Sequence, residues 1–253
     1  MTIELSTEGL TKNFGALCAV DNLDLEIQSG ELVGLIGPNG AGKTTVFNLI
    51  SGFLKPDRGH VYFKEKDITG FKPHRLPRMG LVRTFQLTNN FPNFTVMENV
   101  LLGGHHWAAI TPRTIFSRPP RHERQEAMGV LHLVGLDHLA DEMAVTLASG
   151  QQKRLQLAVA MMAHPELLML DEPLSGMTPE EINFLLQSIK DIIDKGVTVF
   201  LIEHNMKAVM RVCEHIIVLD FGAKIAEGTP EHIQQHPQVI EIYLGTDEGD
   251  HDA

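Results

Sequence analysis

A glycine-rich run followed by a lysine and two threonines is the segment best suited to holding phosphate. It reads Gly37-Pro38-Asn39-Gly40-Ala41-Gly42-Lys43-Thr44-Thr45, between an apolar stretch at 32–36 and a helical pattern that ends near Gly52. Glycines let successive backbone N–H groups turn toward a phosphate, and the start of a helix adds positive potential. In this strand–loop–helix setting Lys43 would reach the β- and γ-phosphates and the Thr44 hydroxyl would bind Mg²⁺. The run therefore predicts a P-loop that binds a nucleoside triphosphate.

Two neighbouring carboxylates follow a second apolar stretch. Asp171 and Glu172 come directly after Leu-Leu-Met-Leu at 167–170. Ligands bind at the carboxyl ends of strands in open α/β sheets, so Asp171 would hold Mg²⁺, directly or through water. Glu172 would act as the general base on the attacking water. Alone, such a pair is as often a solvated strand end, but beside a P-loop it predicts nucleotide hydrolysis.

The elements that must position these residues alternate between short apolar stretches and amphipathic helical patterns. This alternation is typical of an α/β fold with a mostly parallel core sheet. Buried strands are expected at 32–36, 167–170, 197–202 and 216–219. An N-terminal antiparallel β subdomain is expected from strands at 3–10, 20–27 and 59–63. Helical signals dominate from about 87 to 160, which predicts a helical subdomain inserted within one domain over 1–245, followed by an acidic frayed tail at 246–253.

The clearest helix signal follows Thr178. Thr178 and Glu181 have the spacing of a capping box, Pro179 suits the first helical position, and Gly196 suits the end. The apolar residues recur at helical spacing along one face, at Ile182, Leu185, Leu186, Ile189, Ile192 and Ile193.

Composition limits the class of protein. The chain has 253 residues, 43% hydrophobic and 21% charged, which is ordinary for a globular protein. Its 21 Lys and Arg against 32 Asp and Glu give a net charge of −11, which argues against nucleic acid as the main partner. Cys18 and Cys213 are far apart, and we expect buried free thiols in a reducing compartment. With no secretory signal and no apolar stretch of about 18–20 residues, we expect another chain to provide any membrane attachment.

A third segment, Leu147-Ala148-Ser149-Gly150-Gln151-Gln152-Lys153-Arg154, leads into a helical pattern. The order of the P-loop, Gln86, this segment, Asp171-Glu172 and His204 resembles the ATP-binding cassette (ABC) ATPase family. The resemblance extends over about residues 3–245. It implies the fold of a P-loop ATPase, with ATP and Mg²⁺ as cofactors.

In that family the third segment is the signature motif, which binds the γ-phosphate of ATP held by the opposite subunit. The resemblance gives this role to Ser149, Gly150 and Gln151. The sequence departs from the common Leu-Ser-Gly-Gly-Gln form, because Ala148 and Ser149 occupy its second and third positions. The usual hydroxyl is therefore missing. Backbone N–H groups at the helix start would still bind phosphate, with Ser149 as a candidate substitute donor. The alternative is that Ser149 forms an ordinary capping box with Gln152.

The resemblance assigns three further residues. Gln86 matches the family's Q-loop glutamine, which contacts Mg²⁺ or the attacking water and passes the nucleotide state to the membrane partner. His204, after the strand at 197–202, matches the switch histidine that touches the γ-phosphate. Phe14 matches the aromatic residue that stacks on adenine, and its alternative is a small hydrophobic plug before a turn. Thr178 stands where the family often has Asp or Asn, so its capping role is the simpler interpretation.

Several sequence segments in and around these motifs are similar to segments of the ATPase subunits of branched-chain amino acid importers. The similar segments are 80–86, 91–92, 95–100, 147–152, 202–204 and 242–245. The segment 105–124, rich in arginine, is either a solvated excursion or a docking surface beside membrane subunits. Such importers pair two ATPase chains, identical or related, with two transmembrane permease subunits and, indirectly, a substrate-binding protein.

The resemblance thus implies an ATPase at the cytoplasmic face of the inner membrane that energises uptake of branched-chain or other hydrophobic amino acids. One alternative is an ABC ATPase of another machine, for lipopolysaccharide or lipid export or for iron–sulfur assembly. A second alternative, from a different class of protein, is a nucleotide sensor that binds ATP without hydrolysing it. A sensor would lack Lys43, Glu172 or His204, and all three are present.

Overall fold

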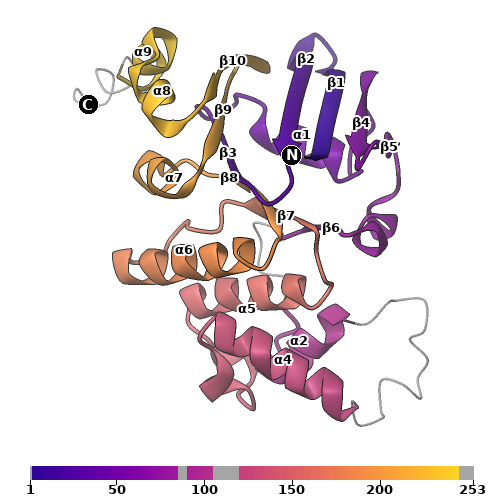
Figure 1. The fold of residues 1–253 in the computed structure, drawn as a ribbon, viewed down its shortest axis with the longest axis vertical. Helices are drawn as coiled ribbons and strands as arrows, with labels where there is room; N and C mark the ends of the chain where they lie inside the picture. Colours follow the sequence, from indigo (N-terminus) through magenta and orange to yellow (C-terminus); the bar gives the residue numbers. More distant parts are fainter. Residues whose placement is uncertain (1, 85–89, 105–119, 245–253) are drawn as a thin grey trace. The chain divides into compact units, whose positions relative to one another are not determined.

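The computed structural model describes residues 2–84, 90–104 and 120–244 (Figure 1). Its contacts divide the chain into two compact units. The first unit comprises Met1–Pro73 and Gly196–Ala253, and the second comprises His74–Lys195. The tail at 246–253 and most of the segment 105–124 lie outside the described residues.

The first unit contains one antiparallel sheet and part of a second, mostly parallel sheet. Its strands are β1 (Ile3–Phe14), β2 (Leu17–Gln28), β3 (Leu32–Ile36), β4 (Arg58–Phe63), β5 (Lys66–Asp67), β8 (Thr198–Ile202), β9 (His215–Asp220) and β10 (Ala223–Gly228). Its helices are α1 (Lys43–Ile50), α7 (Met206–Val212), α8 (Pro230–Gln235) and α9 (Pro237–Leu244).

An antiparallel sheet has the strand order β2-β1-β4-β5, which confirms the predicted antiparallel β subdomain (Figure 1). Side chains of β2 alternate between the two faces: Leu23, Leu25 and Ile27 are buried, while Asp24 and Glu26 between them are exposed. This period of two is what a strand with one face on the core requires.

The strands of the second sheet that belong to this unit follow the order β10-β9-β3-β8. β3 runs parallel to both β8 and β9, and β10 closes the edge antiparallel to β9. Every residue of β3 and β8 is buried, as expected for strands covered on both faces. Helix α1 packs on this sheet, with the rings of Phe47 and Phe200 centred 4.9 Å apart. The predicted strands at 32–36, 197–202 and 216–219 are confirmed to within two residues.

The second unit is mainly helical. It contains the parallel pair β6 (Leu81–Arg83) and β7 (Leu167–Asp171) with α2 (Val96–Gly104), α4 (Arg121–Leu133), α5 (Ser149–Met161) and α6 (Pro179–Ile193). Single-turn 3₁₀ helices lie at η1 (Pro73–Arg75), η2 (Pro77–Met79), η4 (Asp137–Leu139) and η5 (Ala144–Thr146). α2, α4 and α5 contact one another (Figure 1), in agreement with the helical content predicted for this part of the chain.

Helix α6 begins as the sequence predicts. The Thr178 hydroxyl accepts from the Glu181 N–H at 3.3 Å, and the Glu181 carboxylate accepts from the Thr178 N–H at 2.9 Å. Pro179 is the first helical residue. Leu185, Ile189 and other members of the predicted apolar face are buried. The capping box therefore fixes where the helix starts.

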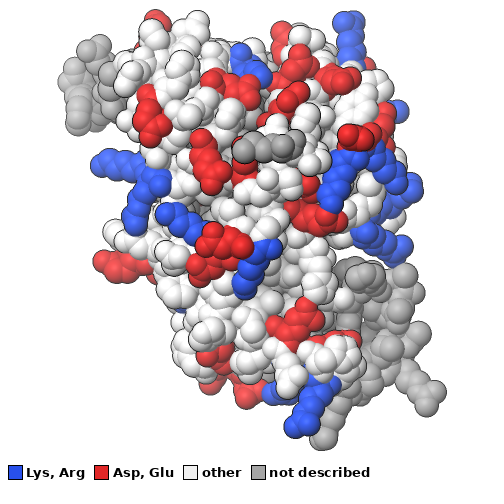
Figure 2. All heavy atoms as spheres, in the orientation of Figure 1, with Lys and Arg blue, Asp and Glu red and all other residues white. Residues whose placement is uncertain are grey.

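On the face drawn in Figure 2, acidic and basic side chains of the described residues lie interspersed among uncharged ones. Within the described ranges, no helix combines the length and apolar character that crossing a bilayer requires.

Candidate active site

The P-loop connects β3 to α1 in the first unit, and two of its glycines are required by the backbone path. Gly37 has φ +151° and Gly42 has φ +99°, both in the region that disfavours side chains. A Cβ on Gly37 would come within 2.2 Å of the Leu219 carbonyl oxygen, and one on Gly42 within 2.3 Å of the Ala19 carbonyl oxygen. The loop is thus seated against β9 and β2 by contacts that only glycine allows.

Lys43 folds back over this loop. Its side chain is buried, and Nζ donates to the carbonyls of Gly37 at 2.6 Å and Pro38 at 2.8 Å. No side-chain hydrogen bond caps α1, which begins at Lys43, and Thr44 in its first turn is exposed. The ammonium group is therefore held over a helix start where backbone N–H groups are available to an anion.

Phe14 lies at the end of β1, and its side chain is 48% exposed. A ring this exposed is not a buried plug, and Lys12 Nζ lies over it, 5.8 Å from the ring centroid. The preceding residues are fixed by Asp57, whose carboxylate accepts from the Asn13 N–H at 2.7 Å and from Lys12 Nζ at 2.9 Å. The Asn13 hydrogen bond, with a smaller effect from Lys12, lowers the pKa of Asp57.

His204 follows β8 in the same unit and is exposed, beside a carboxylate that the sequence analysis did not single out. Glu203 is completely buried, and its Oε2 lies 3.8 Å from His204 Nδ1. The same oxygen accepts from the His204 N–H at 3.2 Å and the Asn205 N–H at 3.5 Å. Asn205 then caps α7 by accepting from the Ala208 N–H at 3.1 Å. Glu203 thus fixes the backbone on which His204 stands.

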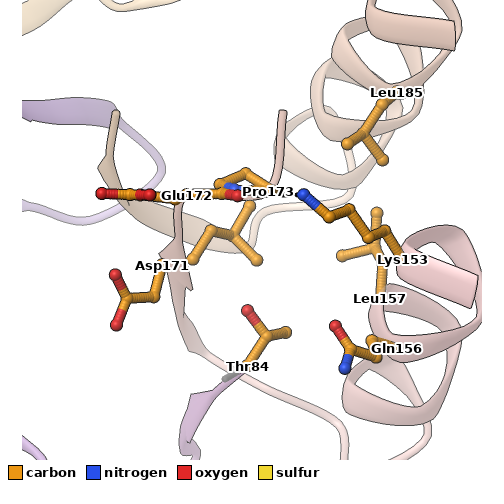
Figure 3. A pocket seen from close by; sticks show the side chains of 9 residues that line it. Thr84, Lys153, Gln156, Leu157, Asp171, Glu172, Pro173 and Leu185 are labelled. Atoms are coloured by element: carbon orange, nitrogen blue, oxygen red, sulfur yellow. Dashed lines mark hydrogen bonds between the residues drawn. The ribbon is translucent and has the colours of Figure 1, made fainter. Parts of the chain in front are cut away.

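In the second unit, Asp171 ends β7 and pairs with an arginine. Asp171 is buried, and its Oδ2 lies 2.7 Å from Arg83 Nη2, whose side chain is also buried. Glu172 follows with φ +47°, an uncommon conformation for a residue with a side chain. Figure 3 shows the Asp171 and Glu172 side chains beside a hollow that Lys153 and Thr84 also line.

The signature segment forms the start of α5, but not with the cap that the sequence suggested. The interpretation of Ser149 and Gln152 as a capping box is wrong, because Ala148 is the N-cap and Ser149 is already helical. Gln151 Oε1 accepts from the Ala148 N–H at 2.9 Å, and Gln152 Nε2 donates to the Leu147 carbonyl at 3.0 Å. The Ser149 hydroxyl, on an exposed residue, is therefore not committed to capping through Gln152.

Gly150 leaves room for a neighbouring carboxylate. A Cβ on Gly150 would approach Glu181 Oε1 to 2.2 Å. The start of α5 and the capping box of α6 are therefore in close contact. Substitution of Gly150 would disturb both helix starts.

The predicted site residues divide between the two units. The first unit holds Phe14, His204 and the P-loop residues Gly37, Pro38, Asn39, Gly40, Ala41, Gly42, Lys43, Thr44 and Thr45. The second holds Ser149, Gly150, Gln151, Asp171 and Glu172. Gln86, predicted as a catalytic residue and Mg²⁺ ligand, lies outside the described residues.

Sequence reasoning missed three residues that contact the predicted ones: Arg83, Lys153 and Glu203. Arg83 and Glu203 each occur close to a motif, at the end of an apolar stretch. A charged residue in that position was the sequence signal that could have identified them. Lys153 lies within the signature segment, where nothing in the sequence indicates which residue it contacts.

The donor chemistry fits Mg²⁺. The Thr44 hydroxyl and the Asp171 carboxylate are the hard oxygen ligands that Mg²⁺ prefers, usually one or two from protein with the rest from phosphate and water. Among the described residues, no group of three or more His, Cys, Asp or Glu side chains is placed to hold a metal ion. The Thr44 and Asp171 oxygens therefore suit Mg²⁺ that is bound together with a nucleotide.

A P-loop between a buried strand and a helix, with a carboxylate pair at the end of another strand, defines a nucleotide-binding α/β protein of the P-loop class. Comparison with protein families narrows the class. The ABC transporter model matches residues 20–175, and a model for the branched-chain amino acid ATP-binding cassette transporter matches residues 223–249. The chain belongs to the ABC transporter ATP-binding family.

Relatives in other organisms cover nearly the whole chain. The high-affinity branched-chain amino acid transport ATP-binding protein BraF of Pseudomonas aeruginosa is 42% identical over 248 residues, covering 95% of this chain and 97% of BraF. The corresponding LivG protein of Escherichia coli K12 is 41% identical with the same coverage of both chains.

Solved structures agree. A crystal structure of the ADP conformation of an ATP-binding cassette of an ABC transporter superposes with a TM-score of 0.87 at 34% identity, covering 97% of this chain and 100% of the other. A dimeric cassette in a post-hydrolysis state, bound to ADP and Pi, gives a TM-score of 0.76 at 25% identity, covering 89% of this chain and 98% of the other. The fold predicted from the sequence is confirmed.

Proposed function

We propose that this chain is the ATP-hydrolysing subunit of an ABC importer that energises uptake of branched-chain or other hydrophobic amino acids. The observation that carries the proposal is a complete P-loop together with the Asp171–Glu172 strand end in a chain 42% identical to BraF over 95% of its length. The match of residues 223–249 to the branched-chain amino acid transporter model favours import over lipid export or iron–sulfur assembly.

In this proposal the first unit binds the triphosphate. Lys43 exchanges the Gly37 and Pro38 carbonyls for oxygens of the β- and γ-phosphates, since phosphate is the stronger acceptor for an ammonium group. N–H groups at the start of α1 donate to the same phosphates. Phe14, exposed at the end of β1, stacks on adenine, and such a stack contributes about 1–3 kcal/mol.

Hydrolysis uses groups from both units. Asp171 and Thr44, with Gln86, would hold Mg²⁺, which when bound neutralises charge on the β- and γ-phosphates. Glu172 accepts a proton from water as the water oxygen bonds to the γ-phosphorus, and the bond to ADP breaks. His204, oriented by Glu203, contacts the γ-phosphate.

We propose that two cassettes close over the nucleotide. Ser149, Gly150 and Gln151 at the start of α5 bind the γ-phosphate held by the opposite chain, identical or related. A helix start whose side-chain cap is absent, as at Ala148, leaves N–H groups for this contact. Two transmembrane permease subunits hold the pair at the cytoplasmic face of the inner membrane, and a substrate-binding protein delivers the amino acid to them.

The test combines turnover with co-purification. The purified chain is expected to hydrolyse ATP with Mg²⁺, Lys43→Ala to lose ATP binding, and Glu172→Gln to bind ATP without turnover. Affinity-tagged chain from detergent-solubilised membranes is expected to bring down permease subunits, and reconstituted vesicles to take up leucine, isoleucine or valine. ATPase activity with lipid-exporting or iron–sulfur partners in place of these permeases would contradict the import role.

A further inference from the structure

The side chain of Lys153 reaches from α5 to the turn that carries Glu172. Nζ donates to the Glu172 carbonyl at 3.4 Å and to the Ser175 carbonyl. These carbonyls lie at the two ends of one turn, because the Ser175 N–H donates to the Glu172 carbonyl at 3.4 Å. One ammonium group therefore ties both ends of the turn to the helix.

That turn needs support. Glu172 has φ +47°, where its Cβ crowds the backbone, and residues keep such a conformation only when their surroundings hold it. The backbone conformation at Glu172 sets the direction in which its carboxylate leaves the chain. A contact that fixes this backbone therefore fixes the direction in which the side chain starts and limits where its carboxylate can lie.

The lysine side chain lies in a hollow with both apolar and polar neighbours. Lys153, Leu157, Leu170 and Pro173 line the same hollow, and Figure 3 shows the lysine extending from α5 with its nitrogen toward the backbone of Glu172 and Pro173. A methylene stem on apolar neighbours with the ammonium at carbonyl oxygens is the arrangement that satisfies both parts of a lysine.

Lys153 also stands one helical turn after Ser149. Residues four apart lie on the same face of a helix, so α5 carries its expected phosphate contact and the lysine on one side. The position of the helix start and the position of the Glu172 turn are thus mechanically connected through a single side chain.

We propose that Lys153 is a positioning residue for Glu172 and makes hydrolysis depend on where α5 lies. The inference rests on the proposed function, in which Glu172 is the general base. Lys153 contacts no nucleotide in this scheme. Without Lys153, Glu172 can still accept a proton from water, but its carboxylate is no longer aligned with the attacking water. The chemical step therefore slows while ATP binding is unaffected.

The variant that tests this is Lys153→Met, which keeps the stem and removes the donors. Its kcat is expected to fall about 10- to 100-fold, a part of what a general base contributes. KM and the Kd for fluorescent ATP with Mg²⁺ are expected to stay within about twofold, since no binding contact is lost. Lys153→Arg, which retains a cation and several donors, is expected to recover most of the rate. Lys190→Met, at an exposed position on α6, is the matched control and should behave as wild type.

ATP-dependent dimer formation provides a second readout. Lys153→Met should accumulate the ATP-bound dimer, as Glu172→Gln should, because only the chemical step is affected. An unchanged kcat would overturn the proposal, and so would a loss of ATP affinity or of dimer that parallels the loss of rate. If the methionine variant does not fold, Lys153→Gln is judged by the same criteria. A wild-type chain that neither binds nor hydrolyses ATP would instead overturn the proposed function itself.

Discussion

Arg83 and Asp171 form a buried ion pair, with Nη2 and Oδ2 2.7 Å apart and the two side chains only 6% and 4% exposed. They stand on the adjacent parallel strands β6 and β7, where the Cα partner of Arg83 is Met169. The guanidinium thus holds the carboxylate that we propose as the Mg²⁺ ligand. A carboxylate this deeply buried needs such a partner, since a lone buried charge is strongly disfavoured.

Removing the arginine should therefore destabilise the fold. Arg83→Met is expected to lower the free energy of unfolding by about 3–5 kcal/mol, the usual effect of breaking one side of a buried pair. Urea unfolding of the nucleotide-free protein would measure it. The double variant Arg83→Met/Asp171→Asn should lose less than the sum of the single losses, because neither charge remains unpaired. Additive losses would show that the pair does not contribute as a unit.

Gly42 should tolerate no side chain. Gly42→Ala places Cβ 2.3 Å from the Ala19 carbonyl in a backbone of φ +99°, so the P-loop must shift. Gly40→Ala is the matched control: φ is +84°, but no atom lies within 4 Å of the added Cβ. We expect the melting temperature to fall further for Gly42→Ala than for Gly40→Ala. Equal effects would mean that the close contact between Gly42 and the Ala19 carbonyl of β2 does not contribute to stability.

The β9–β10 hairpin should respond to acid through Glu227. Burial alone would raise the pKa of Glu227, but hydrogen bonds from Lys224 and His215 outweigh it and the pKa is lowered from 4.5. A carboxyl group whose pKa is lower in the folded state than in the unfolded state stabilises the fold at any pH above the unfolded-state pKa. This contribution is lost as the pH falls through the folded-state pKa. Glu227→Gln should thus be less stable than wild type at pH 7, with a difference that shrinks below about pH 4.5. A difference constant from pH 7 to pH 3 in urea unfolding would argue against this role.

The two thiols should react differently. Burial, helped by the carboxylates of Glu214 and Glu203, raises the pKa of Cys213 to about 12, so almost no thiolate forms at pH 8. Cys18 is half-buried, which corrects the prediction that both thiols are buried. Iodoacetamide should label Cys18 in the folded protein and Cys213 only in urea. Labelling of the Cys18→Ser variant without denaturant would contradict the burial of Cys213.

The sequence was sufficient where a local rule decides the structure. The strand before the P-loop, the capping box at Thr178 and the glycines at 37 and 42 follow from backbone sterics and hydrogen bonding, which act over a few residues. These features were predicted with their bounds nearly correct.

Contacts between distant residues were not predictable in this way. Arg83 and Asp171 are separated by 88 positions, and Lys153 and Glu172 by 19. Only the pairing of β6 with β7 and the placement of α5 bring them together. The cap of α5 was predicted wrongly for a related reason. Ser149 has the better capping side chain, but Ala148 takes the extended N-cap conformation and its N–H donates to Gln151 Oε1.

We propose that two chains share each ATP, with the P-loop of one chain and the α5 start of the other on the same triphosphate. Light scattering of the Glu172→Gln variant with ATP and Mg²⁺ tests it most directly. We predict a dimer holding two ATP molecules, absent with ADP and abolished by adding Gly150→Asp. A Glu172→Gln chain that stays monomeric with ATP bound, while the wild type hydrolyses ATP at a rate per chain independent of its concentration, would contradict it.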